Sequence, residues 1–246
     1  MAKSYLQLNV QILYWLFVGS WRQRLFKVSE VFHQMIRIGV EALPMASLTS
    51  ASIGLTLAMQ GANTLRRMGA EAFVPDLVSV SLLRELGPLL VAVIVIGRSG
   101  SSVTAELGTM KVSEEIEALE VMAVNPVRYL ILPRFLAMMI MLPCLTVVGN
   151  YVALAGGWTI CYFALDMTTS SYIAKVVAAA SMTDLYSGMA KSVVFAWLTI
   201  TIACNAGLNV SGGAEGVGRA TTQSVVYSLL AVLVANALMT AAFFFL

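Results

Sequence analysis

The chain has 246 residues, of which 59% are hydrophobic and only 11% charged, and its mean hydropathy is +0.84. Soluble domains carry about 25% charged residues. A nucleic-acid-binding protein would show a clear basic excess, whereas 15 Lys and Arg against 13 Asp and Glu give a net charge of only +2. The composition excludes a soluble enzyme, a secreted disulfide scaffold and a disordered chain. It predicts an all-α integral membrane protein with a single membrane domain over residues 1–246.

The first 36 residues are apolar in part but contain too many polar side chains to cross a membrane. The stretch Tyr5–Val18 is interrupted by amide side chains and is followed by Trp21-Arg22-Gln23-Arg24. Aromatic side chains of this kind gather at the level of the lipid headgroups. A signal peptide is the alternative, but no small-residue cleavage site follows the apolar stretch. We expect residues 1–36 to form an amphipathic helix region in the cytoplasmic interface.

Long stretches without a charged residue predict the membrane-spanning helices, because a hydrocarbon core of ~30 Å needs about 20 apolar residues. One further stretch, Leu77–Gly97, is largely apolar but contains Arg84 and Glu85. It is included because the neighbouring spans would otherwise end on the wrong side of the membrane. The five predicted spans are Ala42–Leu65, Leu77–Gly97, Phe135–Leu165, Ser192–Ala214 and Ala220–Leu246.

The distribution of Lys and Arg in the short loops predicts the orientation. A cytoplasmic N-terminus places ten basic residues inside and four outside, and it leaves the C-terminus in the periplasm. Residues 166–191 then form a periplasmic segment, in which we expect a short helix at the outer face. The four outside residues are Arg66, Arg67, Lys175 and Lys191.

The two charges within the second span are the strongest functional signal. A charge at membrane depth costs on the order of 2.5–3.5 kcal/mol on insertion scales, so each must face a partner or water. Arg84 and Glu85 are adjacent and cannot form an ideal pair with each other on a helix. They either form structural ion pairs to another helix or line a substrate cavity, where the Arg fork suits a lipid phosphate. Gly87 and Pro88 follow and favour a bend.

The cytoplasmic segment 106–124, between the second and third spans, predicts a short amphipathic helix. The second span is expected to end in the turn Gly97–Gly100, Ser113 is the expected N-cap, and Asn125-Pro126 should end the helix. The pattern predicts a docking element for a soluble partner, and a merely solvated helix is the alternative. The apolar stripe is Val112, Ile116, Leu119 and Ala123, and the acids are Glu114, Glu115, Glu117 and Glu120.

The chain lacks the Gly-rich Lys-Ser/Thr motif that cradles nucleotide phosphates, so the energy for any transport is expected to come from another chain. Metal ligands usually occur close together in the sequence, whereas the three cysteines and the one histidine are widely spaced. We therefore expect no metal site and no cofactor in this chain. The residues concerned are Cys144, Cys161, Cys204 and His33.

These segments together resemble the MlaE (YrbE) permease family, which supplies the membrane subunit of ABC transporters associated with MCE proteins. The resemblance runs in order from about Gln60 to the C-terminus. The motifs are Ser81–Pro88, Gly97-Arg98-x-Gly100, Ala105–Met110, Glu114–Met122, Pro126-x-Arg128-Tyr129, Pro133-Arg134 and Gly218–Thr222.

The resemblance implies a homodimer at a bacterial inner membrane that binds a cytoplasmic ABC ATPase, which holds ATP and Mg²⁺. It further implies that phospholipid is exchanged with a periplasmic MCE-domain protein. By this resemblance Arg84 and Glu85 line the lipid cavity, and Glu114–Met122 is the coupling helix, which contacts the ATPase.

Two alternative functions remain open from the sequence. A proton-coupled secondary lipid transporter would use Glu85 as its titrating group and would need no ATPase. A membrane anchor without a transport path would only hold a periplasmic complex in place. The dependence of lipid movement on ATP separates the first alternative from an ABC permease, and replacement of Arg84 and Glu85 tests the second.

Overall fold

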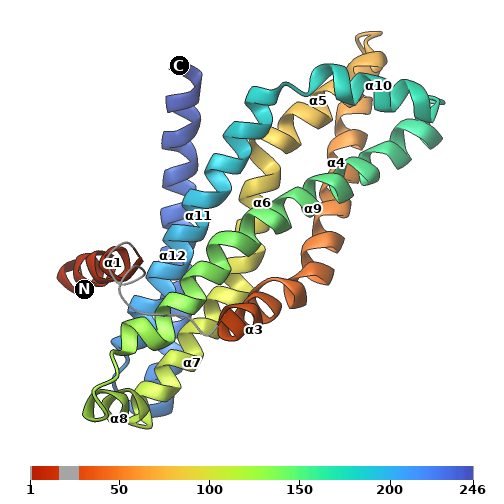
Figure 1. The fold of residues 1–246 in the computed structure, drawn as a ribbon. Coiled ribbons are helices and arrows are strands. Elements are labelled where there is room, and N and C mark those ends of the chain that lie inside the picture. Colours follow the sequence, from red (N-terminus) through yellow and green to blue (C-terminus); the bar gives the residue numbers. More distant parts are fainter. Residues whose placement is uncertain (1, 17–27, 246) are drawn as a thin grey trace. The chain divides into compact units, whose positions relative to one another are not determined.

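The computed structural model describes residues 2–16 and 28–245 of the chain, and its regular elements within these ranges are all helical (Figure 1). Among the described residues, five helices are long and apolar enough to cross a membrane, as predicted. They cover Ser29–Arg66, Glu71–Val112, Val127–Ala164, Met182–Leu208 and Gly213–Phe243.

Within these spans, η4, η5 and η6 are π-helical, and η2 and η3 are short 3-10 helices. The elements in chain order are α1 (Ala2–Tyr14), α3 (Val28–Ile38), η2 (Val40–Ala42), α4 (Leu43–Arg66), η3 (Glu71–Phe73), α5 (Val74–Ser81), η4 (Leu82–Leu86), α6 (Gly87–Val95), η5 (Ile96–Gly100), α7 (Ser101–Val112), α8 (Glu115–Val121), η6 (Val127–Ile131), α9 (Leu132–Ala164), α10 (Thr169–Ala179), α11 (Met182–Leu208) and α12 (Gly213–Phe245).

Residue contacts divide the chain into two compact units. Unit 2 comprises Leu43–Ile94, Leu142–Val193 and Asn236–Leu246. Its apolar core is formed where α4, α5, α9 and α10 pack together, and it includes the fully buried side chains of Ala58, Val74 and Val78. Unit 1 comprises Met1–Ala42, Val95–Met141 and Val194–Ala235.

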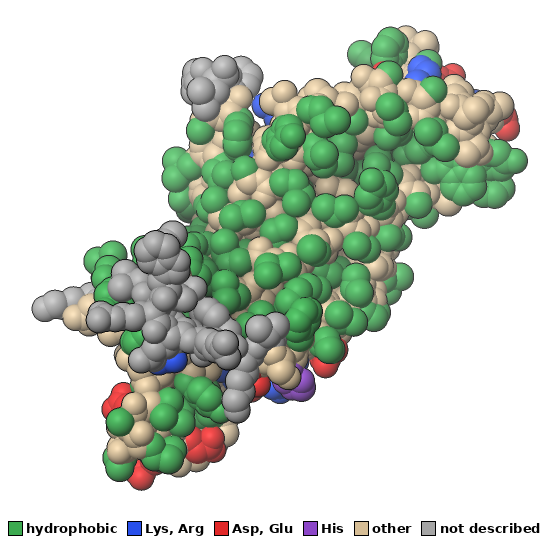
Figure 2. All heavy atoms as spheres, viewed as in Figure 1, with side chains coloured by type: hydrophobic (Ala, Val, Ile, Leu, Met, Phe, Trp, Pro, Cys, Tyr) green, Lys and Arg blue, Asp and Glu red, His purple; other side chains and the backbone are tan. Residues whose placement is uncertain are grey.

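Large apolar side chains remain exposed along the long helices, as Figure 2 shows. In α12 they include Leu230, Val234 and Leu238, each more than half exposed. A surface of this kind would cause aggregation in water, but it suits the hydrocarbon of a bilayer. Of the three cysteines, Cys161 and Cys204 are buried as expected, whereas Cys144 is exposed.

The second spanning helix is longer than predicted. Gly97–Gly100 does not end it, because the helix continues through π-helical η5 into α7 and stops only at Val112. Glycine lowers helix propensity by about 1 kcal/mol, but Ile96 and Ser99 of this segment are buried in unit 1. Tertiary packing therefore outweighs the local preference for a turn.

The short helix α8 lies between the second and third spans, but its ends differ from the prediction. Ser113 is not the N-cap; Glu114 occupies that position with a φ of 60°. The helix ends at Val121, and the Asn125 side chain instead accepts hydrogen bonds from the backbone N–H groups of Val127 and Arg128. Asn125 thus caps the start of the third span rather than ending α8.

Helix α1 lies within residues 1–36, the region predicted as interfacial, whereas α3 begins there and continues to Ile38. By length and composition α3 joins α4 in the first spanning helix, which therefore begins earlier than the predicted Ala42. Residues 17–27, including Trp21–Arg24, lie outside the described residues. In unit 1, α1 lies crosswise to α11 (Figure 1), with Leu8 and Ile12 buried. The Tyr5 hydroxyl lies 2.9 Å from the Thr201 hydroxyl, so polar contacts also hold α1 to this spanning helix.

Candidate functional site

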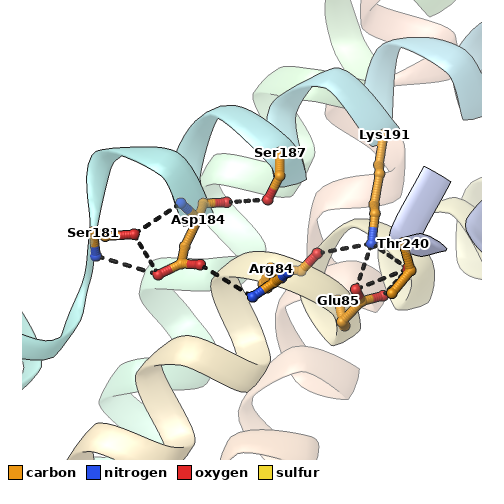
Figure 3. A network of polar contacts seen from close by, with 7 residues as sticks. All are labelled: Arg84, Glu85, Ser181, Asp184, Ser187, Lys191 and Thr240. Carbon is orange, nitrogen blue, oxygen red and sulfur yellow. Dashed lines mark hydrogen bonds and ion pairs between the residues drawn. The ribbon is translucent and has the colours of Figure 1, made fainter. Parts of the chain in front are cut away.

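Arg84 and Glu85 lie in the π-helical segment η4 and face residues of α11 in unit 2 (Figure 3). Arg84 Nη1 lies 3.9 Å from Asp184 Oδ1, and Glu85 Oε1 lies 2.6 Å from Lys191 Nζ. The two adjacent charges therefore pair with two different residues of one neighbouring helix. With Thr240, these four residues form what we call the Lys191 cluster, which carries two positive and two negative charges.

Lys191 is the buried centre of this cluster, and its side chain is only 1% exposed. Its ammonium group donates to Glu85 Oε1 at 2.6 Å and to the Thr240 hydroxyl at 2.8 Å. The Thr240 hydroxyl also lies 2.9 and 3.1 Å from the two carboxylate oxygens of Glu85. A buried charge is tolerated when it is paired and hydrogen-bonded, and Lys191 meets both conditions.

Lys191 also replaces a backbone hydrogen bond that is missing from the second spanning helix. Pro88 has no N–H, so the turn that contains Arg84 loses one backbone donor. The carbonyl oxygen of Arg84, four residues before Pro88, accepts a hydrogen bond from Lys191 Nζ at 3.3 Å. The same ammonium group therefore holds the backbone of η4 and the side chain of Glu85.

Asp184 is fixed by the start of α11. The Ser181 hydroxyl accepts a hydrogen bond from the Asp184 N–H at 3.1 Å, and Asp184 Oδ2 accepts from the Ser181 N–H at 3.3 Å and from its hydroxyl at 2.6 Å. This reciprocal pattern is a capping box, which satisfies free N–H groups at a helix N-terminus. The other carboxylate oxygen of Asp184 remains directed at Arg84 (Figure 3).

Close packing brings α11 against η4. A Cβ atom on Gly188 would lie 2.1 Å from the Leu83 carbonyl oxygen, so only glycine permits this approach. Gly87 at the start of α6 is also closely packed, because a Cβ there would lie 1.7 Å from Asn150 Oδ1 of α9 and 2.7 Å from the Leu82 carbonyl oxygen. Gly188 thus permits the close approach of α11 to η4 across which the two ion pairs form.

The members of the cluster differ in their access to a ligand. The side chains of Arg84 and Glu85 are 35% and 28% exposed, whereas those of Asp184 and Lys191 are 12% and 1% exposed. Arg84 and Glu85 are thus the accessible charges, and each is paired with a more buried residue of α11. They are not sealed inside protein packing, so both predicted roles, ion pairing and cavity lining, are compatible with this placement.

Two buried amide oxygens lie beside the cluster. Asn150 Oδ1 lies against Gly87, and Asn236, whose carbonyl oxygen is 2.9 Å from the Thr240 hydroxyl, has its own Oδ1 buried. Neither Oδ1 has a hydrogen-bond partner among the described residues. Buried acceptors are generally satisfied by protein or ordered water, so each of these oxygens can accept a hydrogen bond from a donor other than the described residues.

The acids predicted for the coupling helix lie in unit 1, at the tip of the hairpin formed by α7, α8 and η6. Figure 2 shows acidic side chains gathered there. Glu114, Glu115 and Glu120 are exposed, whereas Glu117 binds Lys111 of α7. This hydrogen bond to an ammonium group lowers the pKa of the Glu117 carboxyl. Three of the four predicted acids therefore remain accessible, and the fourth joins α8 to α7.

The predicted apolar stripe of α8 is only partly buried. Ile116 is buried and Leu119 half-buried, but Val112 and Ala123 are exposed, because α7 and the positive φ of Ala123 interrupt the helical periodicity. The most exposed apolar side chain at this tip is Val121, at 88%. Exposed apolar and acidic side chains therefore occur together at the tip of the hairpin.

Asp184, Lys191 and Thr240 are members of the cluster that the sequence prediction does not include. It places the first two in the external segment 166–191, whereas α11 begins at Met182 and contains both. Two signals are present in the sequence. Ser181-x-x-Asp184 is a capping-box pattern that marks a helix start, and the spacing of seven between Asp184 and Lys191 places both on one helical face.

Comparison with known proteins decides the family of this chain. A family model described as permease MlaE matches residues 31–242. A probable ABC transporter permease protein of Rickettsia prowazekii is 37% identical over 217 residues, which cover 88% of this chain and 84% of that protein. The chain belongs to the MlaE permease family.

Other relatives of this MlaE-family permease come from photosynthetic organisms. A probable ABC transporter permease protein of Synechocystis is 37% identical over 203 residues, covering 82% of this chain and 77% of the relative. The chloroplastic protein TRIGALACTOSYLDIACYLGLYCEROL 1 of Arabidopsis thaliana is 33% identical over 211 residues, covering 86% of this chain and 60% of that protein. With its five apolar helices, the chain is a multi-pass membrane permease.

Proposed function

We propose that this permease is the membrane subunit of an ABC transporter that moves phospholipid between a bacterial inner membrane and a periplasmic MCE-domain protein. Two copies enclose the lipid path, and a separate cytoplasmic ATPase that binds ATP and Mg²⁺ docks on α8. The N-terminus is cytoplasmic and the C-terminus periplasmic. The similarity to proteins named ABC transporter permeases supports the class of transporter.

The observation that carries the substrate proposal is the accessible Arg84–Glu85 pair within an apolar spanning helix. Arg84 offers a planar fork of N–H donors, which suits the phosphate of a lipid headgroup. Its ionic partner among the described residues, Asp184, lies at 3.9 Å, which is longer than a charge-assisted hydrogen bond. A phosphate can therefore compete for the guanidinium while the lipid tails contact apolar helices.

Glu85 completes a site for a zwitterionic headgroup. Its carboxylate is held by Lys191 and Thr240 but is 28% exposed. A headgroup amine can approach this carboxylate while the phosphate meets Arg84. The Arabidopsis relative is named after a glycolipid built on diacylglycerol, which supports a membrane lipid as the class of substrate.

The test is transfer of labelled phospholipid from proteoliposomes that contain the permease and the purified ATPase, with and without ATP. We expect ATP-dependent transfer that falls about tenfold in Arg84→Gln, the factor for one hydrogen bond to a charged group. Arg66→Gln is the matched control, because Arg66 is a 70% exposed arginine outside the cluster. Transfer by Arg84→Gln at the wild-type rate would contradict the role of the cluster.

The same assay separates the alternatives. Transfer driven by a pH gradient without ATP, and abolished by Glu85→Gln, would identify a proton-coupled secondary transporter. An assembled complex that moves no lipid in wild type, or moves it equally well after replacement of both Arg84 and Glu85 by Ala, would identify a membrane anchor or a different lipid path.

A further inference from the structure

Glu106 of α7 binds cations from two other elements of unit 1. Its Oε1 lies 2.7 Å from Arg37 Nη2 of α3, and its Oε2 lies 3.2 Å from Arg134 Nη2 of α9. The Ser102 hydroxyl donates to Oε1 at 3.1 Å. One carboxylate thus joins three helices, with a different oxygen for each cation. We call Arg37, Glu106 and Arg134 the Glu106 cluster.

Arg134 anchors this cluster on the third span. Its side chain is only 8% exposed, and its Nη1 donates to the Leu130 carbonyl at 2.7 Å. Glu106 is 22% exposed, and Arg37 is 46% exposed. The link from Glu106 to Arg134 is therefore the buried half of the cluster, and the link to Arg37 of α3 is the accessible half.

Further contacts hold the C-terminal end of α3 to the second spanning helix, which also contains Glu106. Arg98 of η5 donates to the Arg37 carbonyl at 3.1 Å and binds Glu41 at 2.7 Å. The Ser99 hydroxyl donates to the Ile38 carbonyl at 2.8 Å. The last carbonyl groups of a helix lack intrahelical donors, and a cation is favourable there. These side chains therefore cap α3 from the second span.

The helix α8 belongs to the same group of contacts. The Lys111–Glu117 ion pair joins it to α7, and the buried side chain of Ile116 packs beneath it. Glu106 lies on α7 between Lys111 and η5. Its ion pair with Arg134 joins α7 to α9, the helix that follows the hairpin. Two ion pairs therefore connect α8 to α3 through α7.

We propose that Glu106 is a positioning residue that couples α3 to the cytoplasmic hairpin, so that movement imposed on α8 reaches the membrane interface through α3. This inference rests on the proposed function, because the ATPase supplies the movement. Helix α3 carries the exposed apolar side chains of Phe32 and Ile36. Coupled to the hairpin, it displaces interfacial lipid whenever α8 moves.

The experiment compares wild type with Arg37→Gln and Glu106→Gln, each reconstituted with the ATPase. Hydrogen–deuterium exchange of residues 28–38 should be about fivefold faster in Arg37→Gln, the upper range for a partly exposed ion pair, and at least as fast in Glu106→Gln. Lipid transferred per ATP hydrolysed should fall several-fold in both variants, while exchange in α8 and ATPase binding stay unchanged.

Two controls accompany these variants. Arg37→Lys retains the ion pair and should restore both exchange and coupling. Glu71→Gln removes the carboxylate of an exposed pair in unit 2, where Arg66 Nε lies 4.0 Å away, and should change neither. Arg37→Gln leaves the buried Glu106–Arg134 pair intact, so the test does not depend on the folding of Glu106→Gln.

Three outcomes would contradict the link, the coupling role or the proposed function. Unchanged exchange of α3 in Arg37→Gln would overturn the link itself. Faster exchange with unchanged transfer per ATP would overturn the coupling role. Wild-type protein without any ATP-driven transfer would show that the proposed function fails and the coupling role with it, whereas exchange of α3 would still measure the link.

Discussion

The Lys191 cluster and the Glu106 cluster use the same ion-pair chemistry in different ways. Each contains a buried cation, Lys191 at 1% and Arg134 at 8% side-chain exposure. In the Lys191 cluster every acid has its own base, and the two accessible charges sit on one irregular helical turn. In the Glu106 cluster one carboxylate serves two bases on separate helices. The first arrangement leaves two charges accessible, which suits the proposed lipid headgroup site, and the second joins three helices, which suits the proposed coupling role.

The burial of the two clusters predicts how strongly each member matters. A buried pair that loses one partner leaves an uncompensated charge, whereas a partly exposed pair exchanges its partner for water. Stability should therefore depend most on Lys191 and less on the contacts near α8.

The largest effect is expected for Lys191→Met. The substitution leaves the Glu85 carboxylate without its cation and the Arg84 carbonyl without its donor, and should lower the free energy of unfolding by about 3 kcal/mol. Thermal unfolding in detergent measures the change. Adding Glu85→Gln should recover part of the loss, and Lys175→Met, at an exposed hydrogen bond to Ala72, serves as the control. Equal stability of the Lys191 and Lys175 variants would contradict the comparison.

Gly188→Ala should have the next largest effect. The new methyl group would meet the Leu83 carbonyl oxygen at 2.1 Å and push α11 away from η4. Overpacking of this kind costs about 2 kcal/mol. Gly218→Ala provides the matched control, since no atom lies within 4 Å of its Cβ position. The control should be neutral or slightly stabilising in the same unfolding assay, and a neutral Gly188→Ala would show that α11 is not held this closely.

A smaller effect is expected at the start of the third span. Asn125→Ala removes the acceptor of the Val127 and Arg128 N–H groups and should cost about 1 kcal/mol. Asn125→Asp retains the acceptor and should be close to wild type. Faster amide exchange at residues 127–131 in the Ala variant alone would confirm the cap, and equal exchange in both variants would refute it.

The smallest effect concerns pH and the contact between α8 and α7. Because Lys111 lowers the pKa of Glu117 from its usual 4.5, the contact contributes fully above that value. It is lost as the pH falls through the lowered pKa, when the carboxylate is protonated. Amide exchange in residues 115–121 should increase over this acidic range in wild type. In Glu117→Gln the increase should be absent, since no group titrates at that position.

The sequence predicts the five spanning helices because apolar, charge-free stretches of this length seldom occur outside membrane helices. It also identifies Arg84 and Glu85, since charges in such a stretch are costly. It does not reveal their partners, because hydropathy treats Asp184 and Lys191 as ordinary loop charges. Their roles depend on which helix packs against η4, and that depends on Gly188, whose meaning appears only in three dimensions.

Local signals near α8 are misleading for a related reason. Gly97–Gly100 and Ser113 have the composition of a turn and an N-cap. The first lies within a continuous helix, where Ser99 and Gly100 are buried, and the second follows the end of α7. Backbone preferences of about 1 kcal/mol decide where a helix ends only when packing stabilises the alternatives equally. In unit 1 the burial of Ile96 and Ser99 favours the continuous helix, so the helix continues through Gly97 and Gly100.

The π-helical segments have a consequence for how mutations in this permease are interpreted. A π turn contains one residue more than the α turn it replaces, so the side chains beyond it are rotated by about 100° relative to a regular helix. A helical wheel drawn for the second span loses its phase after Leu86 and again after Gly100. Scanning mutagenesis or periodic labelling must therefore be analysed in separate blocks, each with its own lipid-facing stripe.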